Sequence, residues 1–423
     1  MIPVEIMMAG PRSLLFDLEK GTRPVLELLQ SDQVCSSVEY IRVEYWGDGN
    51  VLVSDDELIA IFGLIGRLPR IKELRIEFDE LPLPALALKQ ALSCQPSRLR
   101  YLALEDVRLS GTKKDFEEVA EAVKNTISLR TFRMYRCGPF EGTTATLDPI
   151  IEALADVPSL RDVLLSSTHV STETLGKLGE SKFLDNVSLD HMTISAEPLA
   201  QLCKSASIKE LKLWGMPEIN DDITFMTESL YNNKSLKVLR SRYCHLNEEA
   251  GAKVSQMLCS NDTLETIVLE NMNWPNFGAP LAKCFEANCS LVNISLSIDC
   301  AISNLQENAA VMISALEDNT SLRKFRILLR SVNASDLRAA FIAPMEAMLL
   351  KNYTLETVYL NGNILDLGEN INFFLKLNQT RKRHIFRDET ATKEDYIRLL
   401  AENNDDVSIA HYVLVMNPSL FRT

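Results

Sequence analysis

Histidine and cysteine are the side chains of this chain that could bind a metal or act as nucleophiles. Nine cysteines are scattered through the 423 residues without a C-x-x-C pair. The histidines are equally dispersed, at His169, His191, His245, His384 and His411. His169 and His191 follow neighbouring predicted strands, but no zinc-like pattern of cysteine and histidine surrounds either of them. We therefore expect no metal site, and we interpret the cysteines as small buried apolar residues of a reducing compartment.

Motifs for nucleotide binding and acyl transfer are also incomplete. The segment LGKLGESK at residues 175–182 lacks the G-x-x-x-x-G-K-[ST] order of a phosphate-binding loop, and it falls in a predicted helix. No G-x-S-x-G nucleophile elbow occurs, and the abundant carboxylates form no recognisable acid–base pair. We expect no catalytic residue and no cofactor, and hence a protein that is not an enzyme.

The bulk composition is that of a folded protein, with 46% hydrophobic and 24% charged residues. The net charge of −14 would repel a phosphate backbone, which argues against nucleic acid as a partner. The N-terminus lacks a basic segment followed by an apolar run, and no stretch approaches 18 consecutive apolar residues. We expect a soluble cytoplasmic protein without membrane association, with a nuclear location as the alternative.

A repeat occupies most of the chain and is clearest after five asparagines, at positions 233, 261, 288, 319 and 352. Each begins the frame N-x-[ST]-L-x-x-φ-x-φ, where φ is apolar and only Ser241 departs. The φ-x-φ step has the period of a strand with one buried face. Apolar pairs at i and i+4 precede each asparagine, as at Val254 and Leu258, and indicate a helix. Each unit is therefore predicted as a helix, an asparagine and a short strand.

The asparagine is expected to close the helix in the left-handed conformation, with the following Ser or Thr bonded to local backbone. The N-x-[ST] triplets would be glycan sites in a secreted protein. We interpret them as repeat punctuation instead, so they should stay unmodified.

The strand half of the frame extends towards the N-terminus. Twelve strands are predicted, with frames starting at residues 38, 71, 99, 129, 160, 184, 208, 236, 264, 291, 322 and 355. We expect a helical N-terminal cap at residues 1–35, the solenoid at 36–366 and a helical C-terminal cap at 367–423. Within that last cap we expect helices at 371–377, after Thr392 and from Asp406.

The L-x-x-L-x-L cores, such as LRYLAL at residues 99–104, resemble the leucine-rich-repeat family in its ribonuclease-inhibitor-like class. Cys137, Cys244 and Asn363 fill the ninth repeat position, where that family prefers Asn or Cys. Other residues fill it elsewhere: Trp46, Met192, Met216 and Arg330. The resemblance implies an α/β horseshoe with a parallel concave sheet of about twelve strands, helices on the convex side, and protein partners.

Repeat positions three, five and seven should point out of the sheet. Position five is rich in Arg and Lys, and position seven is rich in Asp and Glu, so these columns should pair in the N-terminal third. The middle of the sheet differs because Tyr and Trp enter the columns there. We predict a protein-binding surface on the concave face at Arg133, Tyr135, Asp190, Trp214, Arg240 and Arg242. The alternative for Trp214 is packing against a neighbouring side chain.

The first functional hypothesis is a monomeric, non-enzymatic scaffold that binds a protein or peptide on the concave face. Some proteins of this class activate small GTPases, which is the second hypothesis, although this chain lacks the long acidic tail of the Ran-activating branch. A ubiquitin-ligase substrate receptor is the third, and the 35 residues before the first predicted strand are few for an F-box. The basic run Arg381–His384 is interpreted as a solvated face, with nuclear import or an acidic partner as alternatives.

Overall fold

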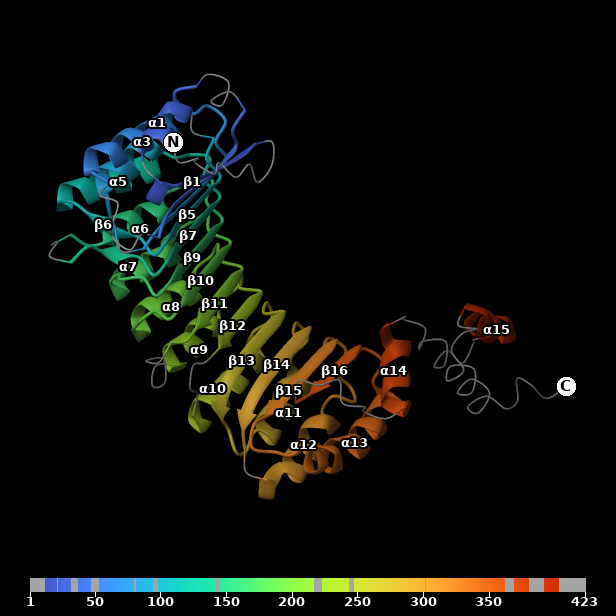
Figure 1. Ribbon diagram of the computed structural model, residues 1–423. Helices are drawn as coiled ribbons and strands as arrows, with labels where there is room; N and C mark the ends of the chain where they lie inside the picture. Colours follow the sequence, from blue (N-terminus) through green and yellow to red (C-terminus); the bar gives the residue numbers. More distant parts are fainter. Residues whose placement is uncertain are drawn as a thin grey trace. The chain divides into compact units, whose positions relative to one another are not determined.

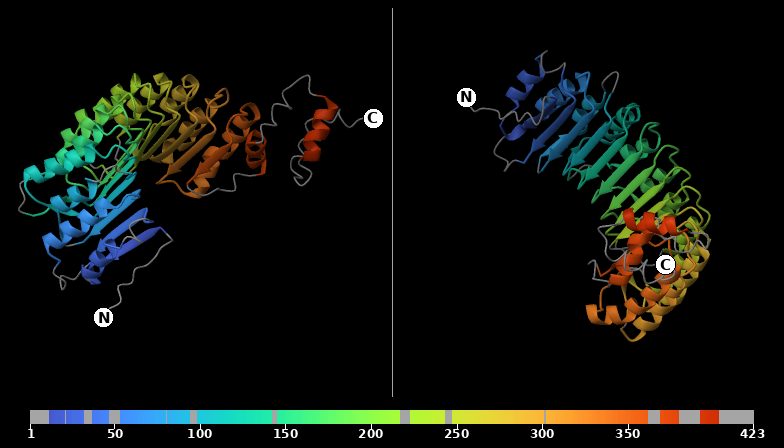
Figure 2. Two further views of the ribbon diagram at one scale, coloured as in Figure 1. Left: turned by 90° about the horizontal axis from the view of Figure 1, so that it is seen from above. Right: turned by 90° about the vertical axis from the view of Figure 1, so that its right-hand side faces the viewer.

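The computed structural model describes residues 12–20, 22–31, 37–46, 53–79, 81–93, 98–141, 145–216, 223–242, 247–300, 302–361, 369–379 and 392–402. The chain divides into two compact units, residues 1–244 and 245–423. In each unit, a parallel sheet is covered by helices on one face and left open on the other (Figures 1 and 2). This is the layered arrangement expected when each repeat contributes one strand and one helix.

Within the described residues, the first unit contains nine parallel strands in the order β1-β2-β3-β5-β7-β9-β10-β11-β12. Their bounds are β1 Ser13–Asp17, β2 Tyr40–Tyr45, β3 Glu73–Phe78, β5 Tyr101–Glu105, β7 Thr131–Tyr135, β9 Asp162–Ser166, β10 Asn186–Asp190, β11 Glu210–Trp214 and β12 Val238–Arg242. A second, three-stranded sheet consists of β4 Pro82–Pro84, β6 Arg108–Ser110 and β8 Gly138–Pro139.

The helices of the first unit follow its strands in the chain. Their bounds are η1 Leu18–Lys20, α1 Arg23–Leu29, α3 Asp55–Arg67, α4 Ala85–Leu92, α5 Lys113–Lys124, α6 Asp148–Ala155, α7 Thr172–Lys177, η2 Leu178–Glu180, α8 Ala196–Lys204 and α9 Ile223–Tyr231. The longer helices bury an apolar stripe, as α5 does with Phe116, Val119 and Val123.

The second unit repeats the pattern with four described parallel strands in the order β13-β14-β15-β16. Their bounds are β13 Thr266–Asn273, β14 Asn293–Asp299, β15 Lys324–Leu329 and β16 Thr357–Leu360. The helices are α10 Glu248–Ser260, α11 Gly278–Ala287, η4 Ile302–Asn304, α12 Leu305–Ser314, α13 Ala334–Lys351, α14 Glu369–Gln379 and α15 Lys393–Glu402. None of the helices in the described ranges is long and apolar enough to cross a bilayer.

All twelve predicted strands are confirmed, and each begins two residues after the first Leu, Ile or Val of its frame. That first residue enters the core from the turn before the strand, as the full burial of Leu129 and Leu160 shows. The α/β leucine-rich-repeat solenoid predicted from the frame is therefore confirmed as the fold class.

The N-terminal cap differs from the prediction, because residues 13–17 form a strand rather than a helix. The sequence SLLFD buries Leu14 and Phe16 and leaves Leu15 half exposed, which is an alternation with period two. β1 pairs in parallel with β2, so it extends the sheet by a thirteenth described strand. The expected helix is present only afterwards, as α1.

The predicted C-terminal helices agree with the structure where it is described. α14 contains the expected segment 371–377. α15 begins after Thr392, whose N–H donates to Asp395 Oδ2 (2.9 Å) while the Asp395 N–H donates to Thr392 Oγ1 (3.3 Å). The basic run Arg381–His384 and the helix predicted from Asp406 lie outside the described residues.

The asparagines that end the helices do not adopt the predicted left-handed conformation. Asn261, Asn288 and Asn352 have φ between −78° and −85° and ψ between 119° and 127°, which is extended backbone. The prediction was wrong because the side-chain amide satisfies the turn, so the backbone needs no left-handed residue.

Asn288 shows how this amide works. Its Oδ1 accepts the N–H groups of Ser290 (3.0 Å) and Leu291 (2.7 Å), and its Nδ2 donates to the carbonyls of Leu258 (2.6 Å) and Asn261 (2.9 Å) in the preceding repeat. The Ser290 hydroxyl reaches the Asn261 carbonyl of the preceding repeat (3.2 Å) as well as Asn288 Oδ1 (3.4 Å), so it bonds across repeats in addition to its own turn. The same set of amide bonds recurs at Asn233, Asn319 and Asn352. The N-x-[ST] triplet therefore fastens one repeat to the next.

Candidate functional site

Neighbouring strands of the first unit pair in register, so equivalent residues form rows across the open face of the sheet. The seventh-position row reads, from β5 to β12, Glu105, Tyr135, Ser166, Asp190, Trp214 and Arg242. The fifth-position row reads Ala103, Arg133, Leu164, Ser188, Lys212 and Arg240. The fourth and sixth positions are buried, as on β10 and β11. The six residues predicted for the site therefore share one face of the sheet.

Three of these six are neighbours in one row. Asp190 on β10, Trp214 on β11 and Arg242 on β12 are direct register partners. The guanidinium carbon of Arg242 lies 5.4 Å from the centroid of the Trp214 ring, which is cation–π geometry. Trp214 is half buried, and its Nε1 is buried without a hydrogen-bond acceptor. The alternative that Trp214 packs against a neighbouring side chain is thus confirmed, and the neighbour is Arg242.

Asp190 is held from both sides. The Ser166 hydroxyl donates to its Oδ2 (3.0 Å), and Nε2 of His191 lies 3.7 Å from its Oδ1. His191 has a φ of 48°, and its N–H donates to the carbonyl of Trp214 (2.7 Å). A Cβ at Gly215, which has a φ of 59°, would lie 2.3 Å from Nδ1 of His191, so a side chain there would require the His191 ring to move.

Left-handed residues recur after the strands of the first unit, at Asp106, Arg136, Ser167 and His191. The N–H of each donates to the carbonyl of the last residue of the next strand, at 2.7–2.9 Å. Each turn therefore continues the ladder beyond the end of its strand and fixes the seventh-position side chains that precede it.

Tyr135 lies in the same row as Trp214 but not in contact with Asp190, because β9 separates β7 from β10. Its ring is covered by Arg136, whose guanidinium carbon lies 4.7 Å from the ring centroid. Arg136 also pairs with Asp106 at 2.6 Å, and this hydrogen bond raises the pKa of the guanidinium above its usual value. Tyr135 still exposes 40% of its surface, so it remains available for contact.

The remaining predicted residues, Arg133 and Arg240, lie on β7 and β12. Arg240 pairs with Glu210 (3.2 Å), which also receives Lys212 (3.3 Å). Arg133 instead stacks on Tyr101 of β5, with 5.4 Å between its guanidinium carbon and the ring centroid. The sequence analysis missed Tyr101, and its signal is an aromatic residue at the outward third position.

A hollow of about 280 Å³ opens on this face over β7, β9, β10 and β11. We call it the Arg133 hollow, and its lining includes Arg133, Asp162, Leu164, Asn186, Ser188 and Lys212. Leu164 was also missed, although it is an aliphatic residue at a fifth position where other repeats carry Arg or Lys. Of the six predicted residues, only Arg133 lines this hollow, which the sequence did not predict.

The charged columns pair as expected only in part. Arg42 bonds to Glu44 and to Glu77, the latter at 2.6 Å, which joins the fifth and seventh positions. Arg75 pairs with Glu73 of the third position (2.6 Å) rather than with the seventh. These pairs are half exposed, so each stabilises the fold by about 1 kcal/mol or less.

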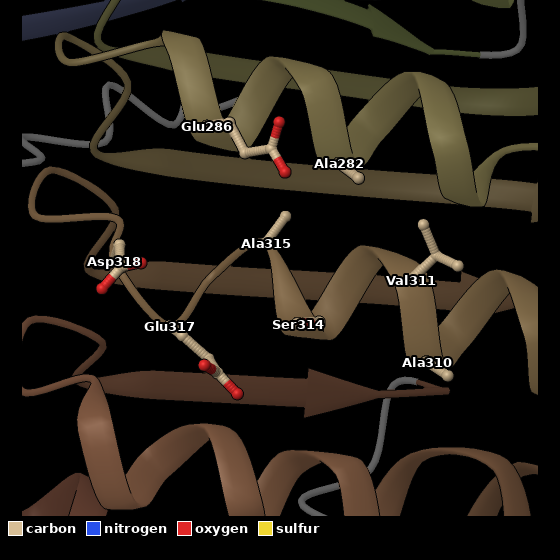
Figure 3. A pocket seen from close by; sticks show the side chains of 8 residues that line it. All are labelled: Ala282, Glu286, Ala310, Val311, Ser314, Ala315, Glu317 and Asp318. Carbon is tan, nitrogen blue, oxygen red and sulfur yellow. The ribbon is translucent and has the colours of Figure 1, made fainter.

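A second hollow, of about 800 Å³, lies among the helices of the second unit and was not predicted. Figure 3 shows it between α11 and α12, lined by Ala282, Val311 and Ala315 with carboxylates at its rim. Val311 exposes 42% of its surface there. This hollow is the strongest feature for binding on the helix side.

The described cysteines are mostly structural. Cys137 and Cys203 are buried, and burial raises the pKa of each thiol to about 12. Among the described residues, no three His, Cys, Asp or Glu side chains come together as a metal site would require.

No family model and no curated protein matches this chain. Solved structures do. An internalin from Listeria monocytogenes is 14% identical, covers 84% of this chain and 92% of its own, and has a TM-score of 0.42. The matched chain of the Toll–Spatzle complex of Drosophila is 13% identical, and the match covers 84% of this chain and 51% of that one with a TM-score of 0.42. A structure of the leiomodin-1 actin-binding site 2 is 13% identical, and the match covers 50% of this chain and 97% of that one with a TM-score of 0.29. Similarity at this level carries no function over to this chain.

Proposed function

We propose that this protein is a non-enzymatic interaction scaffold that binds a protein or peptide on the open sheet face of its first unit. The proposed surface consists of Arg133, Tyr135, Asp190, Trp214, Arg240 and Arg242. The observation that carries the proposal is the cation–π pair of Trp214 and Arg242 on the open face of the sheet. Trp, Tyr and Arg are the residue types that dominate interface energies, and this pair is already assembled before any partner arrives.

The sheet supports the proposal through its rigidity. Adjacent strands lie about 4.8 Å apart, so the row from β7 to β12 spans about 19 Å. Side chains on such a sheet keep their spacing, and an incoming segment meets a preformed surface rather than one that must be ordered.

The finer assignments belong to the same proposal. A helix in most repeats supports the ribonuclease-inhibitor-like class. The net charge of −14 favours a protein partner over nucleic acid. Buried, unpaired thiols at Cys137 and Cys203 fit a reducing, cytoplasmic compartment. We propose a monomer because the surface needs no second copy to be complete.

The test is capture of partners from an extract of the native cells with a Trp214→Ala/Arg242→Ala double variant. Both side chains are half exposed, so the variant should fold, which circular dichroism and thermal melting check. We expect loss of at least one specific partner. The matched control is Val311→Arg, which fills the hollow between α11 and α12 and should leave that partner bound. Survival of every partner in the double variant contradicts the proposal, and loss only in Val311→Arg assigns binding to the helices.

A further inference from the structure

Arg133 differs from the other cations in the fifth-position row of the first unit. Each of the others is paired with a carboxylate, namely Arg42 with Glu77 (2.6 Å), Arg75 with Glu73 (2.6 Å), and Lys212 and Arg240 with Glu210 (3.3 and 3.2 Å). Arg133 is exposed, and within the described residues no carboxylate oxygen lies within 4.0 Å of its guanidinium nitrogens. Among the described residues, its guanidinium makes a cation–π contact with the ring of Tyr101.

The stacking on Tyr101 fixes how Arg133 presents itself. Tyr101 lies between two guanidinium groups, with Arg75 at 5.1 Å and Arg133 at 5.4 Å from its ring centroid. Between them at the fifth position is Ala103, which is completely buried. The ring of Tyr101 attracts the guanidinium as a cation–π partner and accepts none of its hydrogen bonds through oxygen. The N–H donors of the exposed Arg133 are therefore available to a carboxylate that no described residue supplies.

The carboxylates around the Arg133 hollow are already bonded. Asp162 accepts hydrogen bonds from the Thr131 hydroxyl (3.3 Å) and from the Asn186 amide. Glu210 is shared by Lys212 and Arg240. Of the two cations that line the hollow, Lys212 is paired with Glu210, whereas Arg133 has no carboxylate partner among the described residues.

The floor of the hollow is apolar next to Arg133. Leu164 is the register partner of Arg133 on β9, and Ser188 follows it on β10. Both are half exposed, whereas the register neighbours further out are charged. A ligand that reaches Arg133 therefore meets an aliphatic surface within one strand spacing.

We propose that the Arg133 hollow receives an Asp or Glu side chain from an acidic and apolar segment of the protein partner. The carboxylate makes a bidentate pair with Arg133, and an adjacent aliphatic side chain packs on Leu164. This inference rests on the proposed function and adds to it the chemistry of the partner. Charge complementarity selects this occupant, because Arg133 is the cation of its row left without an anion.

The test uses the full chain with 15N-labelled arginine side chains and 13C-labelled leucine methyl groups. It is titrated with acetyl-Leu-Glu-Leu-amide and with the neutral acetyl-Leu-Gln-Leu-amide. We expect the Glu peptide to shift the Arg133 Nε–Hε signal and the Leu164 methyl signals together. The Gln peptide should need at least about tenfold higher concentration, since it cannot form the charge-assisted pair. An equal response to the two peptides, or no Arg133 response at the solubility limit, overturns the proposal.

Two variants and inorganic phosphate serve as controls for the peptide titration. Arg133→Gln should abolish the preference for the Glu peptide, while Arg42→Gln, the same change at a paired cation of the same row, should preserve it. An unchanged preference in Arg133→Gln overturns the proposal. Inorganic phosphate that shifts Arg133 as strongly as the Glu peptide, without Leu164, identifies a simple anion site and also overturns it.

The failure of this inference is distinguishable from failure of the proposed function. If Trp214→Ala/Arg242→Ala loses the partner while Arg133→Gln keeps its Glu preference, the scaffold function stands and the acidic segment is excluded. If the double variant keeps every partner, the scaffold function fails whatever the peptides do.

Discussion

At the scale of single residues, the most informative side chains are the asparagines that resemble glycan sites. Asn288 is 5% exposed and makes four hydrogen bonds to backbone, two of them to the preceding repeat. An asparagine at this place cannot be replaced by a side chain of similar size that lacks either the donor or the acceptor. The triplet N-x-[ST] is thus an element of the fold, and its asparagine is out of reach of an enzyme on the folded chain.

Asn288→Ala should destabilise the protein strongly. Three of the four backbone groups would lose a partner at roughly 1–3 kcal/mol each, since the Asn261 carbonyl keeps the Ser290 hydroxyl, so we expect a total of at least about 3 kcal/mol. Urea unfolding followed by circular dichroism measures it as a lower midpoint. The control is Asn293→Ala on the open face of β14, where a change within about 0.5 kcal/mol is expected. Equal midpoints for Asn288→Ala and the unmodified chain would refute this role.

The buried cysteines give a second prediction at this scale. With the pKa of Cys137 and Cys203 raised to about 12, both should resist iodoacetamide in the native chain even at pH 9. The exposed Cys289 should react under the same conditions, and all three should react in guanidinium. Peptide mapping by mass spectrometry reads the sites. Native modification of Cys137 as fast as Cys289 would show that the core opens at that repeat.

At the scale of elements, helix starts are set by short side-chain to backbone exchanges. In α5, the Thr112 hydroxyl and N–H both donate to Asp115 Oδ2 (2.7 Å each), and the Asp115 N–H donates to Thr112 Oγ1 (3.3 Å). The hydrogen bond from the Thr112 hydroxyl is the largest cause that lowers the pKa of Asp115 below 3.8. α3 begins in the same way, with Ser54 and Glu57.

The contribution of Asp115 should therefore depend on pH. Because its folded pKa is depressed, the stabilisation is present above pH 3.8 and is lost as the pH falls through the lower folded value. Asp115→Ala should lower stability by roughly 0.5–1 kcal/mol at pH 7. The difference from the unmodified chain should shrink at pH 2.5 in urea unfolding. A difference of the same size at both pH values would show that the carboxylate charge plays no part.

The strands could be predicted because their signal is local. The alternation L-x-x-L-x-L needs no knowledge of the neighbours, and it located twelve strands and the face on which the six proposed residues lie. β1 was missed because its alternation in SLLFD is short and Leu15 interrupts it. The Arg75–Tyr101–Arg133 stack was missed because side-chain direction across strands is not written in any single repeat.

The turns after the strands show the other limit. Arg136 and Ser167 are not residue types that favour left-handed backbone. Their conformation is imposed by the carbonyl of the next strand, which their N–H must reach. At the asparagines the opposite error arose, because Asn tolerates the left-handed conformation but is used here for its side chain. The backbone conformation at both kinds of turn depends on contacts between repeats, and the conformational propensity of a single residue does not include those contacts.

At the scale of the whole molecule, each unit presents two kinds of surface. The helices of the second unit hold the larger hollow, while the open sheet of the first unit holds the Trp214–Arg242 stack and the Arg133 hollow. The sheet face is the better candidate because its side chains stand on rigid strands and combine aromatic area with uncompensated charge. We therefore propose that the partner binds the open sheet of the first unit.

Photo-cross-linking from a single position tests this placement most directly. Benzoylphenylalanine replaces Tyr135, which is aromatic, 40% exposed and in the same row as Trp214, or replaces Val311 on α12 as the matched control. In an extract of the native cells, position 135 should cross-link a specific protein, and the Trp214→Ala/Arg242→Ala change should abolish that product. Cross-links from position 311 alone, with none from position 135, would contradict the account.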